Sequence, residues 1–340
     1  MSYNIALQFE DGVSRIISCD ADELVCDAAY RAKINIPLDC RDGACGTCKC
    51  HCESGSFTMG VYIEDAMTDE EADQGYVLTC QMKPTSDCVI KVPASSAACK
   101  TEVGTHGSHL QSINRDSATT VSFTVKSERP VAFLPGQYVN LLVPGSKDTR
   151  SYSFSSAPNR LEQSFLIRDV PDGMMSTFMR HKAQVGDFMM FTGPYGSFYL
   201  RPVQRPVLML AGGTGLAPFL SMLLWLKDNP PAHPIRLAYG VNTNDDLVEL
   251  EQLNALKAAL PDFDYFTTVV DAASGHPKQG YVTSHLSAHD LHEGNVDVYV
   301  CGPPPMVEGV RKWMAGVGVQ PQNFLFLFEK FSSTNETGAA

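Results

Sequence analysis

The stretch that decides the fold is LDCRDGACGTCKCHC, residues 38–52, which places five cysteines within fifteen residues. Seven of the chain's eleven cysteines lie between Cys40 and Cys88. The first residues, MSYNIALQFEDG, lack the basic and apolar regions of a signal peptide, and we expect a cytoplasmic location. Reducing compartments keep thiols free, so this crowding indicates a metal centre rather than a disulfide framework.

The spacing of the cysteines indicates which metal centre it is. Cys40-x4-Cys45-x2-Cys48, followed by Cys80, is the spacing of a plant-type [2Fe-2S] site. The glycines of this loop, residues 43 and 46, allow the backbone angles that a loop folding over a cluster needs. We therefore predict Cys40, Cys45, Cys48 and Cys80 as the metal ligands.

Zinc is the alternative metal. Structural zinc sites prefer paired C-x2-C knuckles, which this spacing matches poorly, although Cys48, Cys50, His51 and Cys52 could build one. Under the iron–sulfur interpretation Cys50 and Cys52 are not ligands and share one face of a strand that leaves the loop.

Length and charge limit the classes of function. A chain of 340 residues predicts two or three domains. Its net charge of −12 argues against a nucleic-acid partner, and its apolar runs are too short to cross a bilayer. Residues 1–93 hold 16 acidic against 7 basic side chains. This acidic third is either a docking face for a basic protein surface or simply a solubilising surface.

The chain divides into three segments of different character. Residues 1–97 alternate apolar and polar positions around Asp11-Gly12 and contain one helical stretch, which predicts a small α+β domain. Residues 98–108 read as a linker. Short, evenly spaced strands in 109–203 predict a small antiparallel β-barrel. Strands alternate with helices in 204–340, which predicts a doubly wound parallel sheet.

The second segment carries a series of short motifs. RSYSFSS (150–156) offers a guanidinium, an aromatic face and hydroxyl groups in close succession. PGQY (135–138) precedes it, and DGMMSTFM (172–179) and GPYGSFYL (193–200) follow. DGMMSTFM resembles the stretch of a flavin-binding reductase family that opens a helix at a bound pyrophosphate.

The third segment carries two glycine-containing loops. AGGTGLAP (211–218) lies between a strand and a helix, where glycines let a dinucleotide approach backbone amides. Pro218 stands where the third glycine of a Rossmann fingerprint would be, so this is a different loop. CGPPPM (301–306) follows a later strand, and Cys301 taken alone reads as a buried strand-end thiol.

Together these motifs resemble two known families over the whole chain. The N-terminal third resembles plant-type ferredoxins, in GYVLTCQ (75–81) and MTDEEADQGY (67–76) as well as in the cysteines. The remainder resembles the ferredoxin–NADP reductase family in R-x-Y-S, G-G-T-G-x-x-P, CGPPPM and FEKF (328–331). The resemblance implies a β-grasp-like ferredoxin domain, an FAD-binding β-barrel and an NAD-binding α/β domain.

The resemblance also implies roles for individual residues. Arg150 would pair with the FAD pyrophosphate, Tyr152 would pack on the flavin ring and Ser153 would lie near its N5. The remaining FAD contacts would be Gly173, Met174, Met175, Ser176 and Phe331, and the NAD contacts Gly212, Gly213, Thr214, Gly215, Gly302 and Pro303. Ser153, Cys301 and Glu329 would be the catalytic group.

NADH is favoured over NADPH as the donor. The residues after the strand IRLAYG, VNTNDDLVE, contain no Arg or Lys to hold a 2′-phosphate. Asp245 and Asp246 would repel one.

The order of the three domains resembles the reductases that serve aromatic-ring dioxygenases and some soluble di-iron monooxygenases, with benzoate and toluate dioxygenase systems as the nearest match. This implies hydride transfer from NADH to FAD and single-electron transfer through the cluster to a Rieske-type oxygenase docking on the acidic domain, by a monomer. Reductases of phenol or toluene monooxygenases and of sugar-deoxygenation systems share the layout. A zinc-stabilised scaffold is the non-enzymatic alternative.

Overall fold

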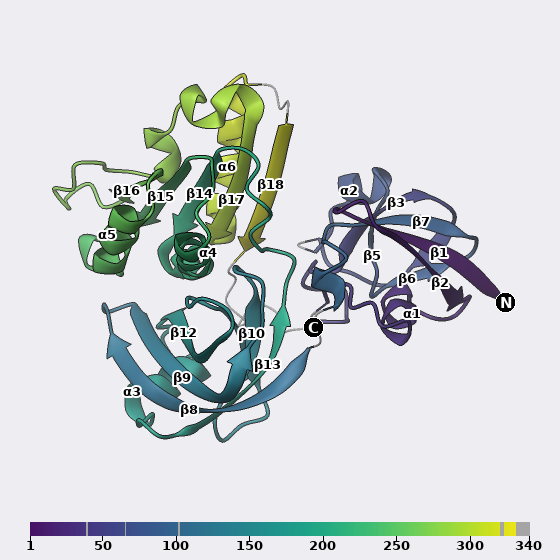
Figure 1. Cartoon of the computed structure of the whole chain (residues 1–340), viewed down its shortest axis with the longest axis horizontal. Coiled ribbons are helices and arrows are strands. Elements are labelled where there is room, and N and C mark those ends of the chain that lie inside the picture. Colours follow the sequence, from purple (N-terminus) through teal and green to yellow (C-terminus); the bar gives the residue numbers. More distant parts are fainter. Residues whose placement is uncertain (39, 65, 101–102, 320–322, 331–340) are drawn as a thin grey trace. The chain divides into compact units, whose positions relative to one another are not determined.

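The computed structural model describes residues 1–340 except 39, 65, 101–102, 320–322 and 331–340. It divides into two compact units (Figure 1). The N-terminal unit comprises Met1–Gly104 and Gly193–Ser197, and the C-terminal unit comprises Thr105–Thr192 and Phe198–Ala340.

The N-terminal unit is built around a five-stranded sheet, with two short α-helices among its described residues. Its elements, with η denoting 3-10 segments, are β1 Ser2–Phe9, β2 Ser14–Asp20, α1 Val25–Arg31, β3 Lys49–Ser54, β4 Phe57–Met59, α2 Asp69–Asp73, β5 Tyr76–Leu78, β6 Met82–Pro84, β7 Cys88–Val92 and η1 Ala98–Lys100. The sheet order is β2-β1-β7-β3-β5, with β4 and β6 as a separate pair. Ile5, Leu7 and Phe9 alternate along β1 into the core, as the period of a half-buried strand requires. The predicted β-grasp-like α+β domain is confirmed.

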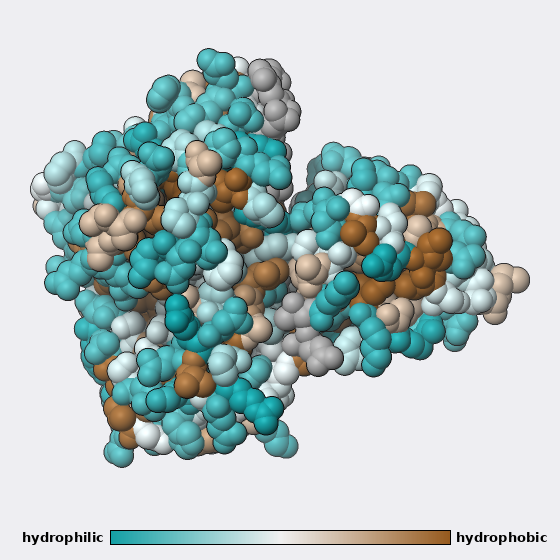
Figure 2. All heavy atoms as spheres, in the orientation of Figure 1, coloured by the Kyte–Doolittle hydropathy of each residue, from teal (hydrophilic) through white to brown (hydrophobic). Residues whose placement is uncertain are grey.

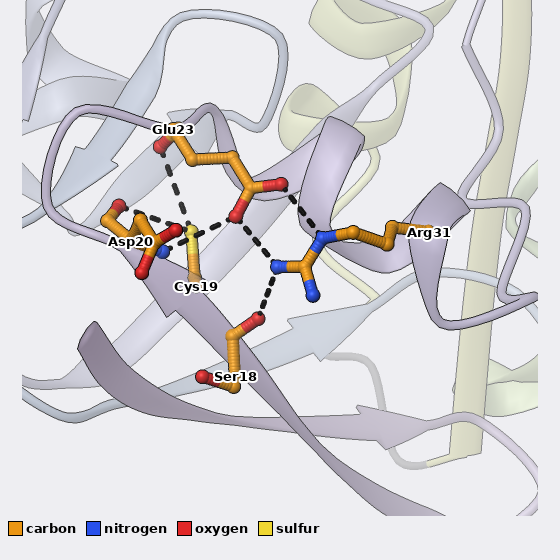
Figure 3. A network of polar contacts seen from close by, with 5 residues as sticks. All are labelled: Ser18, Cys19, Asp20, Glu23 and Arg31. Atoms are coloured by element: carbon orange, nitrogen blue, oxygen red, sulfur yellow. Dashed lines mark hydrogen bonds and ion pairs between the residues drawn. The ribbon is translucent and has the colours of Figure 1, made fainter.

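A polar network fastens α1 to β2 (Figure 3). Arg31, in the last turn of α1, donates to both oxygens of Glu23 at 3.1 and 2.7 Å and to the carbonyl of Ser18 at 2.8 Å. The hydrogen bond from Arg31 lowers the pKa of Glu23. A lowered folded-state pKa stabilises the fold at neutral pH, and this stabilisation is lost as the pH falls through that pKa.

A six-stranded sheet, of which all but Gly104 and Gly193–Tyr195 belongs to the C-terminal unit, curls into a partly closed barrel. Its elements are β8 Gly104–Arg115, β9 Thr120–Val131, β10 Tyr138–Leu142, β11 Thr149–Ser153, β12 Arg160–Arg168, α3 Met174–His181 and β13 Phe188–Tyr195. The order is β11-β10-β13-β8-β9-β12. The two edge strands meet where Phe154, just after β11, bridges to Phe165 in β12. The sheet closed by this bridge is the predicted antiparallel β-barrel.

Aromatic side chains fill the barrel at its point of closure. Phe154 is fully buried and stacks on Phe133 with ring centroids 3.7 Å apart. Phe165 and Phe191 surround it with centroids at 5.5 and 6.5 Å. Closure of the barrel and filling of its core therefore depend on the same ring.

The rest of the C-terminal unit is a parallel five-stranded sheet, ordered β16-β15-β14-β17-β18. Its elements are β14 Val207–Gly212, η2 Gly213–Gly215, α4 Leu216–Asp228, β15 Ile235–Val241, η3 Asn244–Asp246, α5 Leu250–Ala259, β16 Phe263–Val269, η4 Val282–His285, η5 Ala288–Gly294, β17 Asn295–Gly302, α6 Pro304–Gly316 and β18 Asn323–Lys330. Met209 of β14 packs with α4 and α5, whereas its neighbours Leu208 and Leu210 pack with α6 (Figure 1). Helices on both faces confirm the predicted doubly wound sheet.

Two junctions fall near the predicted domain limits. The stretch 98–108, expected as a linker, contains η1 and the start of β8, apart from residues 101–102. Phe198, placed by the sequence in the barrel segment, packs in the core of the α/β part against Phe219 and Tyr299.

The face of the molecule shown in Figure 2 is mainly hydrophilic, with smaller areas where apolar side chains gather. Within the described ranges, every helix is too short or too polar for a membrane span.

The aromatic closure of the barrel gives the first prediction. Replacing Phe154 by Ala should destabilise the barrel by about 3–5 kcal/mol, because it removes a buried ring and leaves a cavity. Thermal unfolding of the purified variant measures this. Phe188→Ala is the control, since Phe188 is 58% exposed on β13. Equal melting temperatures for the two variants would contradict the role of Phe154.

Candidate functional site

The four predicted ligand cysteines come together in the N-terminal unit. Hydrogen-bond contacts with the sulfurs of Cys45 and Cys80 hold the Cys40 pKa well below its usual range. Contact with the Cys80 sulfur likewise lowers the pKa of Cys48. The same contacts raise the pKa values of Cys45 and Cys80. The sulfurs thus form one continuous series of contacts, Cys45–Cys40–Cys80–Cys48.

Backbone amides also point at these sulfurs. The Cys45 N–H donates to the Cys40 sulfur at 3.3 Å, and the Thr47 N–H donates to the Cys45 sulfur at 3.4 Å. Such donors stabilise thiolates and tune the potential of a cluster. Cys45 is exposed, whereas Cys48 and Cys80 are buried.

The glycines of the thiol loop are required by close packing. A Cβ on Gly43 would lie 2.5 Å from the Val61 carbonyl, and one on Gly46 would lie 2.9 Å from the Ala66 carbonyl. Both glycines have positive φ, +83° and +70°. The loop therefore needs glycine at both positions, as the sequence indicated.

These four sulfurs fit a two-iron cluster. Among the described residues, no group of three or more His, Cys, Asp or Glu side chains surrounds a point where a single ion could bind. A [2Fe-2S] cluster shares four thiolates between two irons, so three thiolates around one point are not required. His51, a member of the alternative zinc set, instead bonds the Gln74 carbonyl at 2.9 Å and packs edge-on against Tyr76.

In the barrel, Arg150 lies beside the beginning of α3. Its guanidinium donates to the Thr149 carbonyl at 2.7 Å and contacts the Met174 sulfur at 3.7 Å. A fixed cation next to a helix N-terminus is a combination suited to a pyrophosphate. Tyr152 on β11 lies against the barrel core, and its burial raises its pKa.

The side chains at the start of α3 do not all face outward. Met174 is 39% exposed, but Met175 is buried in the barrel core. The buried Ser176 hydroxyl accepts the Val170 N–H at 2.9 Å, and a Cβ on Gly173 would lie 3.2 Å from that hydroxyl. A bound anion would therefore meet the backbone amides here rather than the side chains of Met175 and Ser176.

The PGQY motif forms a turn that contacts both the α/β part, through Gly136, and the barrel strand that ends near Phe154, through Gln137. Gly136 has φ of +110°, and a Cβ there would lie 2.5 Å from Met222 of α4. The Gln137 carbonyl accepts the Phe154 N–H at 3.1 Å. This turn holds the barrel closure against the α/β part.

The two glycine loops of the α/β part pack directly on each other. A Cβ on Gly215 would lie 2.2 Å from the Cys301 carbonyl, and one on Gly212 would lie 2.4 Å from the Met306 sulfur. A Cβ on Gly302 would lie 2.8 Å from the same sulfur. Gly213 differs, because it has φ of +54° and no atom within 4 Å of its Cβ direction. Three glycines thus serve loop packing, and Gly213 borders open space where a ligand could approach.

The predicted catalytic group comes together in the C-terminal unit. The register of β17 and β18 sets Cys301 beside Glu329, whose carboxylate accepts from the Cys301 thiol at 4.0 Å. The Ser153 hydroxyl, from the barrel, donates to the same carboxylate oxygen at 3.4 Å. Cys301 is fully buried, which raises its pKa far above the ordinary value. Phe331 lies outside the described residues.

In the loop after β15, Asp246 has a structural role that its predicted repulsion of a 2′-phosphate did not include. The Asp246 carboxylate accepts the Thr243 N–H and hydroxyl at 3.2 and 2.8 Å, and it also accepts the hydroxyl of Thr119 in the barrel. Asp246 therefore caps η3 and joins two parts of the unit. Asp245 is exposed.

Sequence reasoning missed the segment 60–63, which supports the thiol loop. The Ile63 N–H donates to the Gly43 carbonyl at 3.2 Å. The Gln81 side chain donates to the Arg41 carbonyl at 3.2 Å. Gly60 and Gln81 are the only sequence features that mark these contacts. Neither lies in a local pattern that would predict a hydrogen bond to a residue so distant in the chain.

Three family models match the chain in order. They describe a 2Fe-2S iron-sulfur cluster binding domain at residues 8–85, an oxidoreductase FAD-binding domain at 108–199 and an oxidoreductase NAD-binding domain at 209–312.

The chain is also similar to known proteins over almost its full length. It is 50% identical to the toluate 1,2-dioxygenase electron transfer component of Pseudomonas putida, over 98% of this chain and 100% of that protein. It is 49% identical to the 2-halobenzoate 1,2-dioxygenase electron transfer component of Burkholderia cepacia, over 98% and 99%. The crystal structure of the Amycolatopsis cytochrome P450 reductase GcoB is similar with a TM-score of 0.73 and 27% identity, over 97% of this chain and 99% of that chain.

The loop packing yields a prediction that separates two roles of glycine. Gly215→Ala should lower both thermal stability and the rate of flavin reduction by NADH, because the new methyl group collides with the Cys301 backbone. Gly213→Ala should weaken NADH binding while lowering the melting temperature much less. Melting curves and stopped-flow flavin reduction measure both. A Gly215→Ala protein with unchanged stability would contradict the packing role.

Proposed function

The chain belongs to the family of dioxygenase electron transfer components, and we propose that it is the NADH-dependent reductase of a benzoate-type ring-hydroxylating dioxygenase. The observation that carries this proposal is near-50% identity over the whole chain to two relatives whose names specify toluate and 2-halobenzoate, both substituted benzoates. When bound, FAD accepts a hydride from NADH, and the cluster relays the electrons singly to the oxygenase.

Cys40, Cys45, Cys48 and Cys80 would hold the cluster. The contact series of their sulfurs supports this set, as do the amides donating to Cys40 and Cys45. Cluster binding requires all four as thiolates, so the thiol protons would be released when the cluster binds.

Arg150 and the first amides of α3 would hold the FAD pyrophosphate, with Gly173, Met174, Met175 and Ser176 shaping this end of the site. The contact of Arg150 with Met174 supports the pairing. Tyr152 would lie against the flavin ring, and Phe331 is proposed to cover it.

Ser153, Cys301 and Glu329 would act at the hydride-transfer position. The Glu329 carboxylate orients the Ser153 hydroxyl, and burial keeps Cys301 a neutral thiol. Gly213 and Thr214 would contact NADH, while Gly212, Gly215, Gly302 and Pro303 would shape the loop surface. NADH remains the proposed donor because the loop after β15 lacks basic residues; Asp245, rather than Asp246, faces solvent there.

The proposed partner is a Rieske-type terminal oxygenase that docks on the acidic ferredoxin domain, with the reductase acting as a monomer. The excess of acidic side chains in residues 1–93 supports this face. None of the eleven cysteines forms a disulfide, which is compatible with the cytoplasm as the proposed location.

Reconstitution separates this function from its alternatives. The purified reductase should support benzoate dihydroxylation with a benzoate dioxygenase and NADH. Coupling only to a phenol or toluene monooxygenase, or to a sugar-deoxygenating enzyme, would instead assign it to those systems. Zinc without flavin or iron in the purified protein would identify a scaffold.

Cys45→Ser tests the cluster assignment. The variant should lose cytochrome c reduction but retain ferricyanide reduction by NADH, because ferricyanide takes electrons directly from the flavin. Cys52→Ser is the matched control and should retain both activities, since Cys52 lies on β3 outside the ligand set. Equal loss of both activities in Cys45→Ser would contradict separate redox modules.

Arg150→Ala tests the flavin assignment. Removing the guanidinium should weaken FAD retention by about tenfold or more, as expected for loss of a charge-assisted phosphate contact. Arg129→Ala, an exposed arginine on β9, is the control. Full flavin content after dilution and gel filtration of Arg150→Ala would remove the proposed role.

A further inference from the structure

Two apolar side chains stand in solvent beside the thiol loop. Val61 is 84% exposed and Ile63 is 44% exposed, in a segment without regular secondary structure. Single exposed apolar residues are ordinary on protein surfaces. The exposure of Val61 and Ile63 is unusual because hydrogen bonds and a packed tyrosine fix the segment that carries them.

The segment 60–63 is anchored on both sides of its exposed residues. Tyr62, between Val61 and Ile63, points inward and packs with the buried cluster that includes Cys48 and Cys80. The Gly60 N–H donates to the Gln81 carbonyl at 2.8 Å, and the Ile63 N–H donates to the Gly43 carbonyl at 3.2 Å. With the partly buried Tyr62 packed against that cluster and both ends of the segment hydrogen-bonded, Val61 and Ile63 are presented to solvent as a fixed pair.

This pair borders the most accessible of the proposed ligands. The Val61 carbonyl lies against Gly43, two residues from Cys45, and Cys45 is the exposed member of the four thiols. Electron transfer weakens steeply with distance, so an acceptor must come close to the cluster edge. Because the backbones of Val61 and Ile63 both contact Gly43, we expect a protein that docks over Cys45 to meet these two side chains as well.

Exposed carboxylates accompany the apolar pair. Asp42 in the thiol loop and Glu64 next to Ile63 are exposed, as are Asp69 and Glu70 shortly after them in the chain. The nearby cations have acidic partners: Arg41 pairs with Asp27 at 3.0 Å and Lys49 with Glu71 at 2.6 Å. An apolar centre with a polar rim is the usual composition of a protein–protein interface, and here the rim is negative.

We propose that Val61 and Ile63 form the apolar centre of the surface that binds the oxygenase component, and that the partner offers an apolar patch bordered by basic side chains. This inference rests on the proposed function and adds the contact residues to it. The acidic side chains then steer the encounter, and the apolar pair sets the lifetime of the complex.

The test uses full-length reductase with benzoate, NADH and the oxygenase component of a benzoate dioxygenase. The double variant Val61→Ser/Ile63→Ser should raise the reductase concentration that gives half-maximal turnover about tenfold, through lost apolar burial. Ile16→Ser is the matched control, because Ile16 is 73% exposed on β2, an edge strand of the five-stranded sheet that contributes no residue to the thiol loop or to segment 60–63. It should leave that concentration unchanged.

Stopped-flow reduction of the cluster by NADH is measured on the same proteins and should be equal in all three. If the double variant needed the same reductase concentration as the wild type for half-maximal turnover, this docking surface would be wrong, whereas the proposed function would stand. Slower cluster reduction in the double variant would overturn the docking surface too, because the pair would then serve transfer within the chain. A wild-type reductase that fails to support the oxygenase would overturn the proposed partner and this surface together.

Discussion

The whole account depends on the contact of four thiols within one small unit. A loop that bends at two glycines directs three cysteine sulfurs towards a fourth from the segment after β5, and the amides of Cys45 and Thr47 point at two of them. Contact among the four sulfurs lowers the pKa of Cys40 and raises that of Cys80. Four thiols held this close together favour binding of a metal cluster, because the metal takes the place of the thiol protons.

A second meeting point links the two parts of the C-terminal unit. Ser153 ends the strand before the barrel closure, and Cys301 and Glu329 lie side by side at the carboxyl ends of β17 and β18. In doubly wound sheets that end of the strands is where ligands bind. The packing of the PGQY turn on α4 and the contact of Thr119 with Asp246 hold the barrel against this edge. The Glu329 carboxylate thereby accepts hydrogen bonds from Ser153 of the barrel and from Cys301 of the α/β part.

The fold class could be predicted from the sequence because it depends on local strand and helix periodicity. The convergence of the four cysteines could be predicted because their spacing is specific to one type of cluster. The sequence could not predict partners distant in the chain. Asp246 was interpreted through its charge, yet it accepts hydrogen bonds from Thr243 and from Thr119 across the unit. The sequence assigns glycines 212, 215 and 302 to ligand approach. It does not reveal that Gly215 lies against the Cys301 backbone or that Gly212 and Gly302 both lie against the Met306 side chain. The inward position of Tyr62, which turns Val61 and Ile63 outward, had no signal in the local pattern.

The most direct test of the central claim is an anaerobic titration with NADH, followed by visible absorbance and electron paramagnetic resonance. The account predicts that NADH bleaches the flavin absorbance and that a reduced [2Fe-2S] signal grows in at about one cluster for each flavin. A flavin that bleaches while the iron stays oxidised, or a preparation without iron, would contradict it.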